Sequence, residues 1–217
     1  MLTLYDYHWS GAAYRTRIAL NLKGLAYEQI AVHLTRDGGE QFKDEYSTLN
    51  PQSFVPTLID GDLKITQSMA IMEYLEETYP EPPLLPPDQA GRTRVRALAN
   101  VVACDIHPIN NLRVRLYLAN EMEKSPEAQA QWIEHWIRLG FEALEVLLRD
   151  SDQTGEYCHG DTPGMADACL VPQVANAERN KVDLSDYPTI MRIVGSCRSN
   201  PLIDKASPFN QPDSPKD

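Results

Sequence analysis

Residues 1–24 read MLTLYDYHWSGAAYRTRIALNLKG, and this stretch sets the beginning of the fold. Residues 2–7 have the pattern of a strand, the pattern breaks at Ser10, and a helical pattern then runs to Lys23. Gly24 is placed to end that helix in the left-handed conformation. The stretch therefore predicts a strand followed directly by a helix, with a serine at the junction.

The next sixty residues continue the alternation of strand and helix. YEQIAVHL (27–34) and TLIDGDLKIT (57–66) have strand patterns, and SMAIMEYLEETY (68–79) has a helical one. Asp60-Gly61 between two apolar runs is a strong hairpin signal, so the flanking segments should pair antiparallel. The predicted order is β-α-β followed by β-β-α.

A proline-rich stretch, YPEPPLLPP (79–87), separates this region from the rest of the chain. Five prolines in nine residues exclude a helix or a central strand, so the stretch is predicted to be a linker. We expect a domain of residues 1–82, a linker of residues 83–91 and a helical domain of residues 92–217.

Everything after the linker has helical patterns, which predict helices over residues 95–106, 132–148, 165–179 and 188–199. The apolar residues of 132–148 cover a wide arc, which is typical of a helix buried on most sides. We expect that helix to form the core of the second domain. The tail NQPDSPKD (210–217) is expected to be loose or to lie on the surface.

Charge and cysteine content restrict the class of protein. A formal net charge of −11 disfavours a general nucleic-acid partner or an acidic membrane partner, because the field of the whole surface repels both. The four cysteines lie far apart without metal-ligand spacing, which indicates reduced thiols. There is no signal-peptide pattern and no apolar run of membrane length. We expect a cytoplasmic protein that contains no metal.

Two junctions between a strand and a helix carry side chains suited to anions. Ser10 is either a simple N-cap or a hydroxyl that donates to an anion, such as a thiolate, beside the positive end of a helix. Gln67-Ser68 offers the same choice at the second junction, where amides and a hydroxyl suit a carboxylate. Two such helix starts in one small lobe suggest one extended anionic ligand between them.

The N-terminal lobe resembles the thioredoxin-like domain of glutathione transferases, and the resemblance covers nearly the whole chain. It continues through NPQSFVPTLIDGDLKITQSMAIMEYLEETYP (50–80), CDIHPINNLRVRLYL (104–118) and LVPQVANAERNKVDL (170–184), which together are similar to the zeta class, the maleylacetoacetate isomerases. The fold class that this implies is an α/β thioredoxin-like N-terminal domain followed by an all-α C-terminal domain.

The resemblance also implies a cofactor, glutathione, and a set of residues. Ser10 would be catalytic and would hold the thiolate, Pro56 would follow a cis peptide that presents the Val55 backbone to the cysteinyl part, and Gln67 and Ser68 would hold the γ-glutamyl end. Further family positions for glutathione fall on Gln41, His107, Asn111, Leu112 and Arg113. Arginines that would bind substrate carboxylates are Arg15, Arg113 and Arg179. Arg15 has the alternative of pinning the first helix by a salt bridge.

The active-site stretch departs from the family pattern R-S-S-C-x-W/Y-R. Trp9 stands for the arginine, Gly11 for the second serine and Ala12 for the cysteine. The missing cysteine is chemically tolerable because the reactive sulfur belongs to glutathione, whereas loss of the arginine bears on affinity or specificity. The family's Thr-x-x-Asp capping box is GMAD (164–167) here, so half of that structural box survives.

The implied activity is the cis-trans isomerisation of maleylacetoacetate to fumarylacetoacetate by reversible thiolate addition, in aromatic amino-acid breakdown. A transferase side activity is compatible with it. Maleylpyruvate isomerase of gentisate breakdown is an alternative, because DIHPINN and the Ser10-Gly11 pair also resemble that relative. A third alternative is a glutathione-binding interaction or regulatory protein without catalysis. The family implies a homodimer with a small dicarboxylate as substrate.

Overall fold

The opening strand of the sequence is β1 (Leu2–Asp6), an inner strand of a four-stranded sheet in the computed structural model, which describes residues 1–215. Its neighbours are β2 (Tyr27–Ala31), which runs parallel, and β3 (Thr57–Asp60), which runs antiparallel. β4 (Leu63–Thr66) completes the order β2-β1-β3-β4. This arrangement confirms the predicted sequence of strands.

The turn between β3 and β4 has the chemistry that a two-residue hairpin requires. Asp60 pairs with Leu63, so the turn consists of Gly61 and Asp62, and Gly61 has φ 57°. Glycine adopts this left-handed conformation without steric cost. The antiparallel hairpin predicted from Asp60-Gly61 is confirmed.

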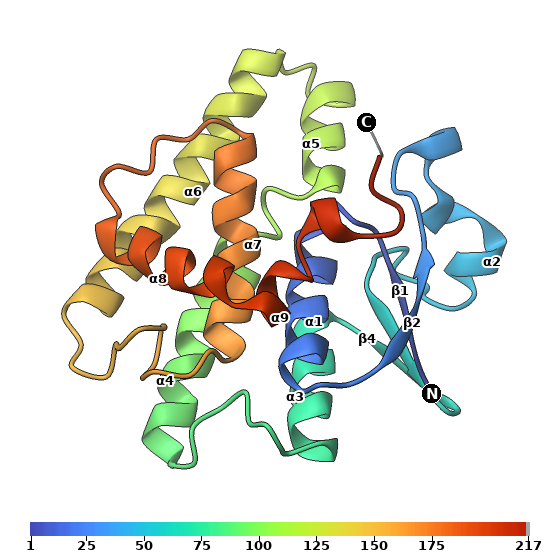
Figure 1. The fold of residues 1–217 in the computed structure, drawn as a ribbon. Helices are drawn as coiled ribbons and strands as arrows, with labels where there is room; N and C mark the ends of the chain where they lie inside the picture. Colours follow the sequence, from blue (N-terminus) through green and yellow to red (C-terminus); the bar gives the residue numbers. More distant parts are fainter. Residues whose placement is uncertain (216–217) are drawn as a thin grey trace. The chain divides into compact units, whose positions relative to one another are not determined.

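Two helices cover the sheet of this first unit. α1 (Gly11–Leu22) and α3 (Ser68–Thr78) lie side by side (Figure 1) and pack against each other. Gly24 follows α1 with φ 65°, as the sequence predicted. Between β2 and β3 the chain forms three short helical segments, which are the 3-10 helices η1 (Arg36–Gly38) and η2 (Glu40–Phe42) and the α-helix α2 (Asp44–Ser47).

The C-terminal segment belongs with the sheet rather than with the helices that precede it. The chain divides into one unit of Met1–Leu84 plus the residues from Ser199 onward, and a second unit of Leu85–Arg198. α9 (Pro201–Asp204) packs on α1, where the Asn21 side chain donates to the Leu202 carbonyl at 3.0 Å. The turn η4 (Pro208–Asn210) follows. The domain of residues 92–217 expected from the sequence thus includes a segment that packs in the first unit.

The proline-rich stretch is fastened to the end of α1 by one buried lysine. Lys23 Nζ donates to the Glu76 carboxylate at 2.9 Å and to the carbonyls of Tyr79 at 2.7 Å and Pro82 at 2.9 Å. Three acceptors satisfy the three donors of the ammonium group. The first part of the linker region is therefore held in place rather than loose.

The second unit consists of helices. They are α4 (Gln89–Asn100), a π-helical continuation η3 (Val101–Ile106), α5 (Leu112–Asn120), α6 (Pro126–Arg149), α7 (Met165–Arg179) and α8 (Pro188–Ser199). The all-helical character expected for this part of the chain is confirmed. Among residues 1–215, no helix combines the length and the apolar character that a membrane span requires.

The expectation that residues 132–148 form a helix buried on most sides is wrong. α6 buries one stripe that includes Ile133, Ile137 and Phe141, but Leu139 is 53% exposed and Leu147 is 49% exposed. α7 is instead the helix buried on most sides, from Met165 through Val174. Its smaller side chains, mainly alanine, valine and cysteine, allow neighbouring helices to pack closely around it.

The half capping box at the start of α7 forms as the sequence indicates. The Gly164 amide donates to Asp167 at 2.9 Å, and the other carboxylate oxygen accepts from the Cys158 amide at 2.9 Å. Burial raises the pKa of Asp167, while these backbone donors lower it. The role of Asp167 is therefore to satisfy buried amides of the second unit.

Candidate functional site

Strand register places three of the predicted ligand-binding segments at the same end of the sheet. Tyr5 pairs with Thr57, and Thr57 pairs with Thr66. The turn that follows β1, the Val55-Pro56 peptide that precedes β3 and the Gln67-Ser68 junction that follows β4 therefore start from neighbouring positions. The sequence suggested one ligand between the two helix starts, and the sheet brings these segments to one end.

Ser10 is the N-cap of α1. Its Oγ accepts from the Ala13 amide at 3.2 Å, and its carbonyl accepts from the Tyr14 amide at 2.8 Å. A hydroxyl has one hydrogen to donate besides its lone pairs, so capping leaves the donor available. The capping interpretation and the thiolate-binding interpretation of Ser10 are therefore compatible.

The Val55-Pro56 peptide is cis, as the resemblance implies. Among residues 1–215, the amide and carbonyl of Val55 make no hydrogen bond, although the residue is buried. The carbonyl just before it, that of Phe54, accepts from the Tyr46 hydroxyl and from Asn50 Nδ2, the latter at 2.7 Å. The structure thus fixes this loop while leaving polar backbone groups of Val55 for a ligand.

Tyr46 and Asn50 are positioning residues that the sequence did not reveal. Both also reach the Thr57 hydroxyl, at 2.8 Å and 3.2 Å, so they tie the loop to the first residue of β3. Burial raises the pKa of Tyr46, which keeps its hydroxyl protonated as a donor. Tyr46 lies outside the stretches that carry the family resemblance, and Asn50 lies at the start of one without an assigned role, because the partners of both residues are brought to them only by the fold.

The second junction has a strained backbone. Gln67 has φ 68°, a value that non-glycine residues rarely adopt, and its side chain donates to Gln52 Oε1 at 2.8 Å instead of capping α3. Ser68, the first residue of α3, is buried. Because strain of this kind is frequent at ligand sites, it supports a binding role for this junction.

Gln41 lies in η2 and is only 3% exposed. Its Nε2 donates to the Leu34 carbonyl at 3.2 Å, but within residues 1–215 its Oε1 has no hydrogen-bond partner. A buried amide oxygen without a donor is costly. This orphaned acceptor suits a ligand that brings an N–H group.

The predicted residues of the second unit lie on two of its elements. His107 directly follows η3. Asn111 is the N-cap of α5, where its side chain accepts from the Val114 amide at 3.2 Å. Leu112 and Arg113 are the first two residues of α5, so these four residues lie in or next to the connection between η3 and α5. Arg179 is the exposed last residue of α7. The roles of these residues remain predictions.

Arg15 is more deeply buried than a simple substrate contact requires. It is 2% exposed, and its Nε has no hydrogen-bond partner among the described residues. The alternative of an ion pair is not found either within residues 1–215. Arg15 therefore keeps a donor available next to the first turn of α1.

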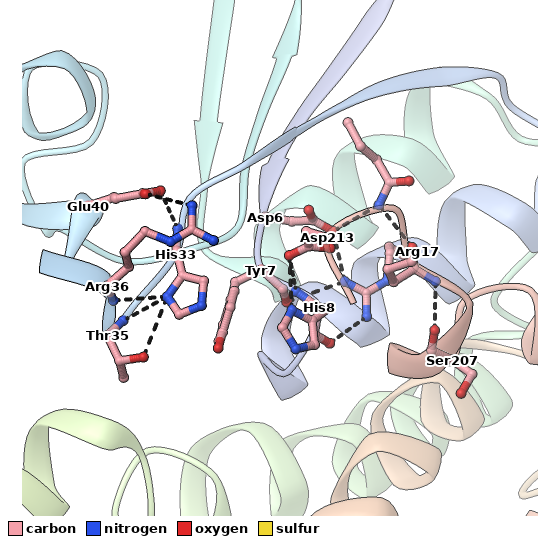
Figure 2. Close-up of polar contacts among 12 residues, drawn as sticks. Asp6, Tyr7, His8, Arg17, His33, Thr35, Arg36, Glu40, Ser207 and Asp213 are labelled. Atoms are coloured by element: carbon pink, nitrogen blue, oxygen red, sulfur yellow. Dashed lines mark hydrogen bonds and ion pairs between the residues drawn. The ribbon is translucent and has the colours of Figure 1, made fainter. Parts of the chain in front are cut away.

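A buried ion pair fixes the strand and the helix on either side of Ser10 (Figure 2). Arg17 Nη1 donates to the Asp6 carboxylate at 2.7 Å, and Arg17 Nη2 donates to the His8 carbonyl at 3.1 Å. Burial raises the pKa of Asp6, and the Arg17 charge opposes that effect. The sequence signal that was missed is a pair of opposite charges, with Asp6 in the strand pattern of residues 2–7 and Arg17 in the helical pattern that follows it.

Comparison with known proteins agrees with this geometry. Residues 1–77 match the family described as "Glutathione S-transferase, N-terminal domain". The chain is 52% identical over 213 residues to the "Probable maleylacetoacetate isomerase" of Vibrio cholerae serotype O1, covering 98% of each protein. It is 48% identical to the solved structure of a maleyl pyruvate isomerase, described as a bacterial glutathione-S-transferase in zeta class, with a TM-score of 0.95 and coverage of 98% and 100%.

A third relative is the maleylacetoacetate isomerase of Anaeromyxobacter dehalogenans 2CP-1, solved with dicarboxyethyl glutathione and citrate in its active site. This chain is 43% identical to it, with a TM-score of 0.87 and coverage of 99% and 94%. The same protein has also been solved with bound glutathione. From the identity along its full length and from the fold, the chain belongs to the zeta class of glutathione transferases, the family of the maleylacetoacetate and maleylpyruvate isomerases.

Proposed function

We propose that this protein catalyses the glutathione-dependent cis-trans isomerisation of maleylacetoacetate to fumarylacetoacetate. The observation that carries the proposal is Ser10, whose oxygen caps α1 while its hydrogen stays available at the positive end of the helix. Family membership supplies the reaction type, because relatives across the full length of the chain bear this name.

The polar groups of the first unit fit glutathione, which carries two carboxylates, an ammonium group, two amides and a thiol. The unpaired backbone of Val55 suits the amides of the cysteinyl part, and the start of α3 at Ser68 suits the γ-glutamyl carboxylate. Gln41 Oε1 suits an N–H donor. His107, Asn111, Leu112 and Arg113 are proposed as further glutathione-binding residues on the family resemblance alone.

Bound glutathione supplies a thiolate, whose reversible addition to the double bond of the substrate allows rotation about that bond. The task of the protein is to keep the thiol ionised at neutral pH. The Ser10 hydroxyl and the free amides of the first turn of α1 favour the anion, because both present positive charge to it. Arg113, Arg179 and Arg15 are proposed to bind substrate carboxylates and to stabilise negative charge that develops on the substrate.

Maleylpyruvate is the second candidate substrate. The solved structure with a TM-score of 0.95 is a maleyl pyruvate isomerase, and maleylpyruvate shares the maleyl end of maleylacetoacetate. A site that recognises this shared end by arginine would accept both. The ratio of kcat/KM for the two substrates therefore decides which isomerase this is.

The direct test measures isomerisation of both substrates by the purified protein with and without glutathione. We expect turnover of maleylacetoacetate that disappears without the thiol, and no net consumption of glutathione over many turnovers. Equal rates without glutathione would refute the thiolate mechanism, and steady loss of glutathione would indicate a conjugating transferase. Glutathione binding with no turnover of either substrate would favour the non-catalytic alternative.

The substrate role of Arg179 makes a separate prediction. Arg179→Lys should raise KM roughly tenfold, because an ammonium group does not reproduce the bidentate contact of guanidinium with a carboxylate, and Arg179→Ala should raise it further. The affinity for glutathione should stay nearly unchanged in both variants. Steady-state kinetics and calorimetric titration of glutathione measure the two effects.

Arg149→Lys is the matched control, because Arg149 is an exposed arginine that contacts its neighbour Asp150. It should leave KM unchanged. If Arg179→Lys behaves like this control, the carboxylate contact belongs to Arg113 or Arg15.

A cytoplasmic homodimer is proposed on the basis of the family. Sedimentation equilibrium of the purified protein tests the dimer, and fractionation of cells tests the location. A monomer at micromolar concentration would contradict the first proposal.

A further inference from the structure

The C-terminal end of the first unit reaches back to the turn that carries Ser10. We call residues 207–213 the strap and Tyr7–Ser10 the thiolate turn. The Asp213 carboxylate accepts from the His8 amide at 3.0 Å and faces His8 Nδ1 at 3.1 Å (Figure 2). Because an ionised carboxylate only accepts, His8 Nδ1 is the donor. Both contacts are with a residue that is nearly fully buried and lies two positions before Ser10.

Arg17 holds the same turn from the other side. Its guanidinium donates to the carbonyl of His8 at 3.1 Å and, through Nε, to the carbonyl of Ala206 at 3.1 Å, immediately before the strap. The Ser10 amide donates to the Tyr7 carbonyl at 2.9 Å and closes the turn. The amide of His8 is therefore held by the strap, and its carbonyl is held by the helix that follows Ser10.

The strap also contacts the residue adjacent to Ser10. The rings of Trp9 and Phe209 meet edge to face, with centroids 5.4 Å apart. Trp9 is partly buried, and Phe209 remains 74% exposed. Such a contact restrains the rotamer of Trp9.

The strap itself is anchored in the core of the unit. Gln211 is buried and donates to the carbonyls of Lys205 at 2.9 Å and Ser207 at 2.7 Å. Its Oε1 accepts from Gln29 on β2 at 2.9 Å. The strap is thus a rigid segment with its own hydrogen bonds to the sheet, and Asp213 extends from it.

We propose that Asp213 and Phe209 are positioning residues for the thiolate turn, which they hold in the geometry that lets Ser10 cap α1 and donate to the thiolate at the same time. The proposal rests on the role of Ser10 in the proposed function. Ser10 must keep one lone pair on the Ala13 amide while its hydrogen points at the ligand. A turn free to shift would still allow the Ser10 oxygen to cap α1, but it would not keep the hydroxyl hydrogen aimed at the thiolate.

The test compares Asp213→Ala with Asp213→Asn. Alanine removes the acceptor of both His8 donors, whereas the asparagine oxygen still accepts from both. In Asp213→Ala we expect the thiolate population of bound glutathione at neutral pH to fall roughly tenfold, the lower end of the effect of losing a group that orients a ligand-binding residue. Asp213→Asn should stay within about threefold of the original protein, because the conservative variant retains the hydrogen-bond geometry.

Three measurements on each variant separate positioning from mere stability. They are the thiolate absorbance of bound glutathione as a function of pH, the glutathione Kd, and the free energy of unfolding. We expect the thiol pKa to rise in Asp213→Ala while Kd changes by less than about threefold, since a positioning residue acts through geometry and not through the contacts that hold the ligand. Asp204→Ala is the matched control, because its carboxylate contacts Asn210 of the strap but makes no contact with the thiolate turn, so it removes an acidic side chain beside the strap without removing an acceptor of His8.

A thiolate titration of Asp213→Ala that overlays the original protein would overturn the proposal, as would an equal shift in Asp204→Ala. If Asp213→Ala does not fold, Phe209→Ala carries the test, because Phe209 is mostly exposed and its loss should raise the same pKa while the fold is retained. An unchanged titration in that variant would also overturn the proposal. If the original protein binds glutathione but does not ionise it, the proposed function fails, and this failure is seen before any variant is made.

Discussion

Replacing Ser10 with alanine is expected to lower the thiolate population of bound glutathione at neutral pH roughly ten- to hundredfold, because one hydrogen bond to a charged group contributes about 1.5–3 kcal/mol. The pKa of the bound thiol rises, since the neutral form loses less than the anion. The affinity for glutathione should change less, because Val55, Gln67 and Ser68 are proposed to hold the rest of the molecule. A pH titration of thiolate absorbance measures the effect.

Ser10→Gly and Ser10→Thr separate catalysis from capping. Glycine at the N-cap costs only a few tenths of a kcal/mol, whereas alanine costs about 1 kcal/mol, yet both lack the hydroxyl. Ser10→Gly and Ser10→Ala should therefore differ in the free energy of unfolding and agree in the pKa of the bound thiol. Threonine keeps a hydroxyl and should retain most of the ionisation. A thiolate titration of Ser10→Ala that coincides with that of the original protein would leave Ser10 with its capping role alone.

Replacing Arg17 with methionine is expected to lower the free energy of unfolding by about 3–5 kcal/mol, since it leaves a buried carboxylate without its partner. Asp6 and Arg17 are both fully buried, and the side chain of Gln29 donates to the same Asp6 oxygen at 3.2 Å, which is too little to replace a cation. Arg36→Met is the matched control, because the exposed Arg36 pairs only loosely with Glu40 at 3.5 Å (Figure 2). That control should cost about 0–1 kcal/mol. Urea unfolding of both variants measures the difference.

The loss in Arg17→Met should depend on pH in a defined direction. Burial already raises the pKa of Asp6 above its usual value, and removing Arg17 takes away the main opposing effect. A carboxyl whose pKa is raised by folding destabilises the folded state once it ionises, so the penalty is largest at neutral pH. It should shrink as the pH falls through the raised pKa of Asp6, where the group becomes neutral. A loss that is independent of pH would show that packing, not charge, explains the effect, and Arg17→Met combined with Asp6→Leu would then fail to recover stability.

The first unit shows how far local patterns determine this fold. The strand β1, the helix α1 with Ser10 at its start, Gly24 with its positive φ, and the hairpin at Gly61 were all predictable, because each depends on residues within a few positions. The bounds of α7 also match the sequence pattern. In these places propensity, capping and turn chemistry agree with the final structure.

The predictions failed where burial depended on distant partners. A wide apolar arc does not reveal which part of it neighbours will cover, so residues 132–148 were expected to be more buried than α6 is. The tail from residue 210 was expected to be loose or to lie on the surface, and its described residues other than Gln211 are exposed or half-buried. Gln211 is nevertheless buried, because its carboxamide satisfies two carbonyls and a side chain of β2.

The candidate site also has features that local sequence determines and features that only the tertiary structure determines. The sequence by itself determined that a serine begins the first helix, that a proline precedes the hairpin and that a polar pair begins the helix after it, since these are features of neighbouring residues. Only the tertiary structure decided that the sheet brings these segments to one end, and that Asp213 bonds a residue 205 positions away in the chain. The physical reason is that hydrogen bonds and ion pairs such as those of Arg17 form between groups that only the packed chain brings together and shields from water, which no local pattern encodes.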